Sequence, residues 1–190
     1  ALSVMENQAN LLHDPDTPVY GPDNAKVAVI EFFDYQCVFC SRFAPELEKV
    51  MKAQPDVRYL FKEWPIFGGR WEASLQAAQQ GLTVWQKKGP QAYVTYHNAV
   101  YATGHNEGKL TAEDILAAAS KAGLAAPAPG DHTASLEKNS NLAEELGLTG
   151  TPGIIVMPVS GATPDTITVF PEAVTAEKLQ AAIRKATRVK

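Results

Sequence analysis

Two cysteines, Cys37 and Cys40, are the only thiols in the chain, and two residues separate them. This C-x-x-C spacing suits thiol–disulfide exchange, because thiols one helical turn apart are close enough to form a disulfide. Zinc sites share the spacing, but two cysteines do not complete a four-ligand structural site, and none of the four histidines lies near the pair. A third interpretation is two buried neighbours without chemistry.

The residues on either side of the pair favour redox chemistry. Residues 26–33, KVAVIEFF, read as a strand buried on both faces, and apolar residues recur at helical spacing after Cys37. Cys37 is therefore expected at the start of a helix of roughly four turns, which Pro45 is expected to kink. A helix start stabilises a thiolate, so Cys37 is the expected nucleophile, with a pKa of about 3.5–7.5. Cys40 is the expected resolving thiol, more buried and less acidic.

Val38 and Phe39, which separate the cysteines, carry no charge and no strong hydrogen-bond donor. The stabilisation that a histidine between two cysteines gives to a thiolate is missing. We expect this pair to be less oxidising than a C-P-H-C pair.

The remaining sequence predicts a βαβ unit and a ββα unit separated by helices. A second strand is expected at 57–61, and residues 70–125 are helical in pattern. The further signals are a capping box at 111–114, a linker-like break at 123–130, a helix at about 131–146 closed by Gly147, a hairpin of GIIVMP and TITVF around a turn at 159–165, and a last helix capped by Thr175.

Composition and charge limit the partners and the membrane association that the sequence supports. The chain has 190 residues and a net charge of −4, which gives no reason to expect nucleic acid or an anionic membrane as a partner. No apolar run is long enough to span a bilayer. Residues 1–20 lack the pattern of a signal peptide, as expected for a mature exported chain and equally for a cytosolic protein.

The strand, the cysteine pair and the helix resemble the thioredoxin superfamily, and the wider match is to its DsbA-like branch. The matching segments are VIEFFDYQCVFC, FKEWPIFG (61–68) and LGLTGTPG (146–153), and the resemblance covers most of residues 19–188. The sequence looks most like the shorter bacterial periplasmic proteins of the Com1 and ScsC type.

This resemblance implies an α/β thioredoxin fold, with a central mixed sheet flanked by helices, interrupted by an inserted helical domain. The expected division is a lead-in or oligomerisation arm at 1–20, the two halves of the thioredoxin domain at 21–66 and 131–190, and the helical domain at 67–130. The arm's apolar positions are Leu2, Met5, Leu11 and Leu12. The alternative for 1–20 is a loosely packed N-terminus on a monomer.

The resemblance also assigns expected site residues. Pro152 is expected to be a cis-proline opposite the cysteines, with the Thr151 backbone free to pair with an extended substrate, and with Val38 and Phe39 beside it. The Thr before the proline is similar to the isomerases of the family. Glu31 matches the buried acid beneath the active site and is expected to relay the proton of Cys40. Its structural alternative is a pairing with Lys62.

For the remaining candidate residues we expect structural roles and not catalytic ones. The four histidines, His13, His97, His105 and His132, are expected on the surface or in loops. Lys62 and Glu63 are expected to form a solvated pair. We expect one of two roles for Trp64, Phe67 and Trp71: an apolar patch near the active site, or ordinary core packing.

The predicted function is that of a periplasmic thiol–disulfide oxidoreductase or isomerase that forms, shuffles or reduces disulfides in exported proteins through Cys37 and Cys40. It needs no cofactor and no metal. The implied partners are unfolded or misfolded cysteine-containing exported proteins, a DsbB-like or DsbD-like membrane redox protein, and a possible second copy through residues 1–20. One alternative is a copper-type thiolate metal-binding or carrier module on the same fold. Another is a glutathione-dependent transferase or isomerase on the same scaffold, whose relatives typically lose the cysteine pair.

Overall fold

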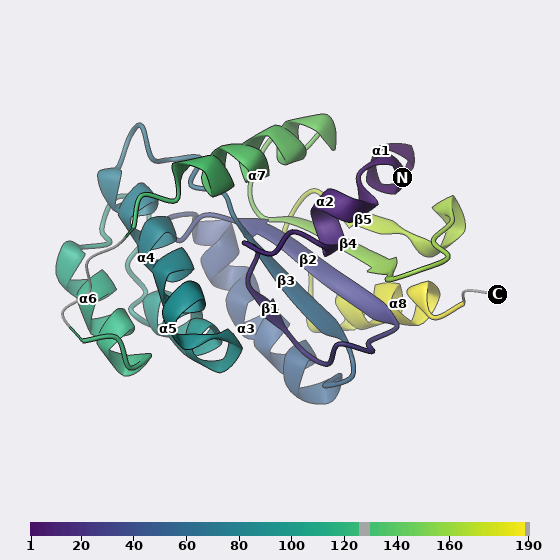
Figure 1. The fold of residues 1–190 in the computed structure, drawn as a ribbon, viewed down its shortest axis with the longest axis horizontal. Helices are drawn as coiled ribbons and strands as arrows, with labels where there is room; N and C mark the ends of the chain where they lie inside the picture. Colours follow the sequence, from purple (N-terminus) through teal and green to yellow (C-terminus); the bar gives the residue numbers. More distant parts are fainter. Residues whose placement is uncertain (126–129, 189–190) are drawn as a thin grey trace.

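The computed structural model describes residues 1–125 and 130–188, and a five-stranded mixed sheet runs through its centre (Figure 1). The strand order is β1-β3-β2-β4-β5. β2 and β3 are parallel, and the other neighbouring pairs are antiparallel. The bounds are Val19–Tyr20 for β1, Val27–Phe33 for β2, Arg58–Glu63 for β3, Gly153–Pro158 for β4 and Thr168–Phe170 for β5. The α/β thioredoxin architecture predicted from the sequence is confirmed.

β2 is the central strand, and every residue in it is buried. Its side chains alternate between two apolar clusters, with Val29 and Phe33 in one and Ile30 and Phe32 in the other. Burial on both faces explains why its sequence is continuously apolar instead of alternating.

Helices cover both faces of the sheet. On one face, α3 (Val38–Ala53) and α8 (Ala176–Ala186) pack with the helical block α4 (Glu72–Lys88), α5 (Pro90–Ala102) and α6 (Ala112–Lys121). On the other face lie α1 (Leu2–Glu6), α2 (Gln8–Leu12) and α7 (Thr133–Glu145). Figure 1 shows the block α4–α6 gathered at one end of the sheet, beside α3. The proposed domain boundaries and the kink at Pro45 stay predictions.

Several local signals are confirmed. Thr111 and Asp114 form the capping box of α6, and Thr175 caps α8 by accepting a hydrogen bond from the Lys178 N–H. Gly147 follows α7 with a φ of +78°, a conformation that favours glycine. Of the predicted break at 123–130, residues 126–129 lie outside the described residues.

The second hairpin strand is shorter than the TITVF pattern indicated. Residues Pro164–Thr166 form a short 3-10 turn, η1, instead of extending the strand. The Thr166 hydroxyl donates to the Thr163 carbonyl at 2.9 Å, and its oxygen accepts from the Thr163 N–H. This local bonding keeps Thr166 out of the ladder, and β5 begins at Thr168.

The alternative of a loosely packed N-terminus is wrong as regards packing. Leu11 and Leu12 are buried in this chain's own core, and Val19–Tyr20 forms an edge strand on β3. The Lys62 ammonium group on β3 donates to the Asn10 carbonyl at 2.8 Å and to the Thr17 hydroxyl at 2.7 Å. Of the apolar positions predicted for an oligomerisation arm, Leu2 is exposed, at 69%. The oligomerisation role stays a prediction.

The solvated pairing of Lys62 and Glu63 is also wrong. Both are buried, and successive strand residues point to opposite faces of the sheet. Lys62 binds the N-terminal segment, whereas Glu63 accepts hydrogen bonds from Tyr35 and Tyr93. Each buried polar group thus finds partners on its own face.

The histidine expectation fails at His97, which lies in α5 and is buried among aromatic rings. Its ring centroid is 4.9 Å from that of Tyr101 and 5.1 Å from those of Phe33 and Phe61. Burial lowers the pKa of His97 to about 4, so its ring packs as a neutral aromatic group. His13 and His105 are exposed, and His132 is half-buried.

Candidate functional site

A turn at the end of β2 fixes the start of α3. The buried Asp34 carboxylate accepts hydrogen bonds from the Gln36 N–H at 2.8 Å and the Phe67 N–H at 2.9 Å. The Ser74 hydroxyl, from α4, donates to the same carboxylate at 2.9 Å. The Asp34 carbonyl in turn accepts from the Cys37 N–H at 3.1 Å. These bonds place Cys37 where the helix begins.

Cys37 is the N-cap of α3, with an extended backbone, and its thiol is free. Its pKa is lowered to about 6, chiefly because the Cys40 side chain forms a hydrogen bond with it. The Thr151 side chain and the backbone N–H groups of Cys40 and Phe39 lower this pKa further, against burial, which raises it. At neutral pH the sulfur of Cys37 is therefore mostly a thiolate.

Cys40 lies one turn further along α3 and is completely buried. Burial raises its pKa well above the ordinary thiol value, and the hydrogen bond to Cys37 and the charge of Glu31 raise it further. The two sulfurs, although neighbours, thus have opposite acid–base character: Cys37 ionises easily and Cys40 holds its proton.

The Thr151–Pro152 segment lies against the nucleophile, and the peptide bond between these two residues is cis. The Cys37 thiol donates a hydrogen bond to the Thr151 carbonyl at 3.3 Å. The Thr151 hydroxyl is buried and has no partner in this thiol form. When Cys37 ionises, its sulfur becomes an acceptor, and this hydroxyl is a donor positioned beside it.

Glu31 is buried in β2, and its Oε1 atom has no hydrogen-bond partner. Burial raises the pKa of Glu31 well above its usual range, and the charges of Cys37 and Glu63 raise it further. The alternative pairing with Lys62 is wrong, because the Lys62 ammonium group binds Asn10 and Thr17 on the opposite face of the sheet. Glu31 thus provides a protonatable carboxyl group near the cysteines.

The residues between the cysteines form part of the surface. Val38 is half-buried, whereas Phe39 is 54% exposed, with the Arg42 guanidinium 5.5 Å from its ring centroid. Of the two expectations for Trp64, a surface patch or core packing, the structure shows core packing. Phe67 and Trp71 are half-buried and pack on each other, with ring centroids 5.3 Å apart.

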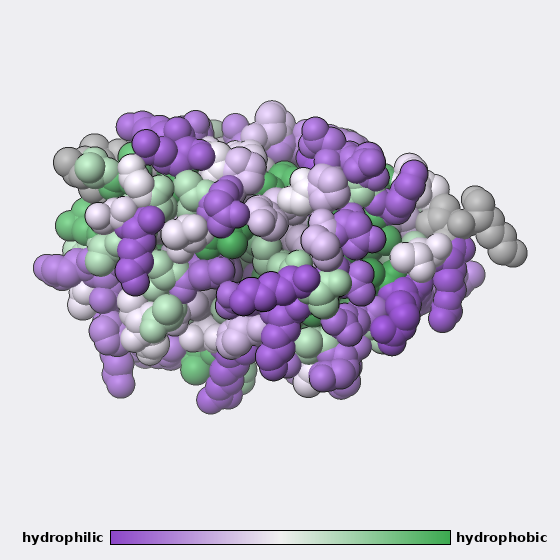
Figure 2. Space-filling view, turned by 90° about the horizontal axis from the view of Figure 1, so that it is seen from below, coloured by the Kyte–Doolittle hydropathy of each residue, from purple (hydrophilic) through white to green (hydrophobic). Residues whose placement is uncertain are grey.

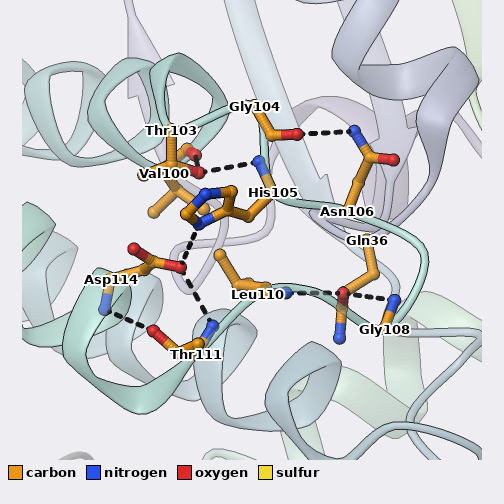
Figure 3. A network of polar contacts seen from close by, with 10 residues as sticks. All are labelled: Gln36, Val100, Thr103, Gly104, His105, Asn106, Gly108, Leu110, Thr111 and Asp114. Atoms are coloured by element: carbon orange, nitrogen blue, oxygen red, sulfur yellow. Dashed lines mark hydrogen bonds and ion pairs between the residues drawn. The ribbon is translucent and has the colours of Figure 1, made fainter.

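Sequence reasoning missed a second polar element, the loop that precedes α6. The Gln36 side chain accepts hydrogen bonds from the N–H groups of Gly108 and Leu110, as Figure 3 shows. The Glu107 carboxylate accepts from the Val38 N–H at 3.0 Å. The glycines of GHNEGK at 104–109 indicate a loop, but no sequence pattern indicates that this loop reaches the active-site helix.

The described residues show neither a built metal site nor a membrane span. No group of three or more His, Cys, Asp or Glu side chains in 1–125 and 130–188 is arranged to hold a metal ion. Over the same ranges, no helix combines the length and the hydropathy needed to cross a bilayer.

Comparison with known proteins identifies the family. The Thioredoxin family model matches residues 13–185, and the chain belongs to this family. Salmonella enterica Typhimurium BcfH is 39% identical, with a TM-score of 0.83 over 97% of this chain and 79% of that one. The catalytic domain of Proteus mirabilis ScsC is 26% identical, with a TM-score of 0.82 over 98% of both chains. A periplasmic thioredoxin-like protein from Salmonella enterica serovar Typhimurium is 30% identical, with a TM-score of 0.77 over 94% of this chain and 95% of that one.

Curated relatives match over a smaller part of their length. Disulfide bond formation protein D of Bacillus subtilis is 33% identical over 88 residues, which are 44% of this chain and 38% of that protein. The Na(+)/H(+) antiporter NhaA 1 of Salinispora arenicola is 25% identical over 151 residues, 75% of this chain and 22% of that protein. The chain thus matches well under half of the length of each of these two relatives. The resemblance to the DsbA-like branch and to ScsC-type thiol–disulfide oxidoreductases is confirmed.

Proposed function

We propose that this chain is a periplasmic thiol–disulfide oxidoreductase that forms, shuffles or reduces disulfides in exported proteins through Cys37 and Cys40. The observation that carries the proposal is the contrast between the two thiols. The pKa of Cys37 is lowered to about 6, while burial raises that of Cys40. Such a pair has one ionised nucleophile and one protonated resolving thiol, which is what disulfide exchange requires.

In the oxidising direction, a client thiolate attacks the Cys37 sulfur of the Cys37–Cys40 disulfide. A client–Cys37 bond forms, the Cys37–Cys40 bond breaks, and Cys40 leaves with the electron pair. Glu31, protonated because burial raises its pKa, donates a proton to the Cys40 thiolate. A second client thiolate then attacks the client sulfur of the mixed disulfide and releases Cys37. The client has lost two electrons and the cysteine pair has gained them.

In the reverse direction, the Cys37 thiolate attacks a client disulfide, and one client sulfur leaves as a thiolate. The ionised form of Glu31, the form left after it protonates Cys40 in the oxidising direction, takes the proton of Cys40. Cys40 then attacks Cys37, which releases the second client sulfur. When a different client thiol resolves the mixed disulfide instead, the client bonds are shuffled and the enzyme stays reduced. Redox partners decide which direction dominates.

Client binding is proposed at Thr151, Pro152, Val38 and Phe39. Phe39 offers exposed apolar surface, and the Thr151 carbonyl, which the Cys37 thiol now occupies, is suited to a backbone N–H of an extended client. Cys37 as a whole residue is 3% exposed, so a client reaches its sulfur when neighbouring groups move aside. The clients are cysteine-containing exported proteins, and a DsbB-like or DsbD-like membrane protein resets the pair.

The periplasmic location is supported by a relative. The Salmonella structure, 30% identical along nearly its full length, is itself named a periplasmic thioredoxin-like protein. Fractionation of the native organism with antibody to this chain tests the location. Recovery with cytoplasmic markers contradicts it.

A paired assay tests the activity. The oxidised protein is mixed with a reduced multi-disulfide client, and the reduced protein with a scrambled one, with Cys37→Ser as the control. Oxidation without unscrambling identifies an oxidase, and the reverse identifies an isomerase. In Cys40→Ala, the client should remain attached to Cys37 as a stable mixed disulfide. If neither client changes and no mixed disulfide accumulates, the proposal fails.

Metal analysis tests the thiolate-carrier alternative. The reduced protein is purified and then offered copper(I), and both samples are compared with Cys37→Ser by mass spectrometry under native conditions. One copper ion retained tightly by the reduced wild type, but not by the variant, supports a carrier.

A further inference from the structure

The loop from Thr103 to Leu110 is fastened to the residue that precedes Cys37. The buried Gln36 side chain uses its Oε1 atom to accept from the N–H groups of Gly108, at 2.9 Å, and Leu110, at 3.3 Å (Figure 3). The Gln36 carbonyl accepts from the Glu107 N–H at 2.8 Å. Three hydrogen bonds therefore fix this loop of the helical block beside the active-site turn.

The fastened loop presents a carboxylate to the first residue of α3. Oε2 of Glu107 accepts from the Val38 N–H at 3.0 Å. Glu107 has a φ of +52°, uncommon for a residue with a side chain, and the bonds of its neighbours hold it there. The helix start that stabilises the Cys37 thiolate thus carries a second negative group.

We infer that Glu107 is a positioning residue that makes the Cys37–Cys40 pair a weaker oxidant. This inference rests on the proposed redox function of the pair. A carboxylate at the Val38 N–H offsets part of the positive end of the α3 dipole and repels a negative charge on Cys37. The disulfide form carries no such charge, so the repulsion disfavours the reduced form alone. A less stable reduced form means a weaker tendency to take electrons from clients.

The other charged groups around this helix start are already engaged. Asp34 is bonded to Phe67 and Ser74, and Arg42 lies over the Phe39 ring. His105, in the same loop, is bonded to Asp114 at 2.8 Å. Glu31 and Cys40, by contrast, are buried, and the Glu31 Oε1 atom has no hydrogen-bond partner. The charge of Glu107 reaches the active-site turn, because it adds to burial in raising the pKa of Asp34.

Glu107→Gln isolates the charge, because glutamine keeps the size and an oxygen for the Val38 N–H. The pKa of Cys37 is measured from thiolate absorbance. The second measurement is the equilibrium constant of the reaction in which the protein dithiol and glutathione disulfide form the protein disulfide and two molecules of glutathione. We expect the Cys37 pKa of the variant to be lower by about 0.2–0.7 than that of wild type. The constant for forming the protein disulfide should be about two- to fivefold smaller. Both values correspond to the usual effect of one charge at a helix end. Added salt should narrow the difference between wild type and variant.

Glu113→Gln is the matched control, since Glu113 is exposed in the first turn of α6 and, within the described residues, forms no hydrogen bond or ion pair with α3. The pair Glu107→Asp and Glu107→Asn repeats the charge comparison with residues that tolerate a left-handed backbone. If the wild type equilibrates with glutathione but both neutral variants match their charged counterparts, the inference is overturned. If the wild type forms no disulfide at any glutathione ratio, the proposed function fails instead.

Discussion

The Cys37 sulfur lies 3.3 Å from the carbonyl oxygen of Thr151, although 114 positions separate the two residues. The contact joins the start of α3 to the loop that enters β4. It places the nucleophile beside a backbone acceptor, on a residue whose buried hydroxyl has no hydrogen-bond partner. An acidic thiol and a backbone edge for a client chain therefore lie at one point of the molecule.

The acidity of Cys37 depends first on Cys40. Because the Cys40 hydrogen bond is the largest cause of the low pKa, Cys40→Ala should move the Cys37 pKa from about 6 toward that of an ordinary thiol. At about pH 6 its alkylation rate should fall roughly tenfold or more relative to wild type. The rate of iodoacetamide labelling, followed against pH by mass spectrometry, measures this. Identical profiles in the two proteins would show that Cys40 has no part in the ionisation.

Glu31→Gln should slow the step in which Cys40 gains or loses its proton. We expect this step to slow by about tenfold to a hundredfold, at or below the lower end of the usual contribution of general acid–base catalysis. Stopped-flow decay of a preformed mixed disulfide measures it. Glu113→Gln is the control, because Glu113 is exposed in the first turn of α6. Equal decay rates in wild type and Glu31→Gln would remove Glu31 from the mechanism.

Two buried carboxyl groups should make the protein less stable as pH rises. Burial raises the pKa of both Glu31 and Glu63, so the folded state keeps protons that the unfolded state releases above about pH 4.3. The free energy of unfolding should therefore fall from about pH 4.3 toward the folded-state pKa values. Urea unfolding between about pH 4 and pH 5, below the midpoint of the Cys37 titration at about pH 6, measures the slope.

The slope assigned to these two groups has its own control. Glu31→Gln and Glu63→Gln should each flatten it, while Glu113→Gln, on the surface, should leave it unchanged. A steeper slope in either buried variant would reverse the sign argued for it.

Gly81→Ala should destabilise the protein. A Cβ atom there would lie 2.6 Å from Oε2 of the buried Glu63 and 3.3 Å from the Tyr35 hydroxyl. Overpacking of this kind costs about 1–3 kcal/mol, which exceeds the gain in helix propensity. Gly69→Ala, where nothing lies within 4 Å, should change the free energy of unfolding by less than about 1 kcal/mol. Urea unfolding of both variants tests the difference, and a Gly81→Ala protein as stable as wild type would contradict the packing around Glu63.

Substitutions at two N-terminal leucines should distinguish a role in folding stability from a role in oligomer assembly. Leu11→Ala should cost about 2–5 kcal/mol, because Leu11 is completely buried. Leu2→Ala should change stability by less than about 0.5 kcal/mol, since Leu2 is 69% exposed. Light scattering with size exclusion measures the mass of each protein. A wild-type oligomer that Leu2→Ala converts to a monomer supports an oligomerisation arm, whereas an unchanged mass opposes it.

The polarity of the molecular surface also bears on whether the protein forms an oligomer. The face in Figure 2 carries interspersed polar and apolar side chains, without a broad apolar area among the residues drawn in colour. A permanent dimer usually buries an interface more apolar than the rest of the surface. This face therefore does not favour a permanent interface, and Leu2 stays the more specific position to test.

Local patterns in the sequence were sufficient for much of this protein. The apolar run of β2, the helical spacing after Cys37, the capping box at Thr111 and the glycine after α7 each act over a few residues. Short-range sterics and hydrogen bonds decide such features, so they can be read from neighbouring residues. The resemblance to a family added the central mixed sheet flanked by helices and the proline beside the cysteines.

Tertiary structure alone decided the partners of the buried polar groups. That Lys62 binds Asn10 and Thr17 while Glu63 binds two tyrosines follows from which helix covers each face of β3. Glu107 meets Val38 because the helical block brings its loop to the start of α3. These contacts join residues tens of positions apart, and no local periodicity encodes them. They arise because burial forces each polar group to find a partner, and the packed fold determines which one is within reach.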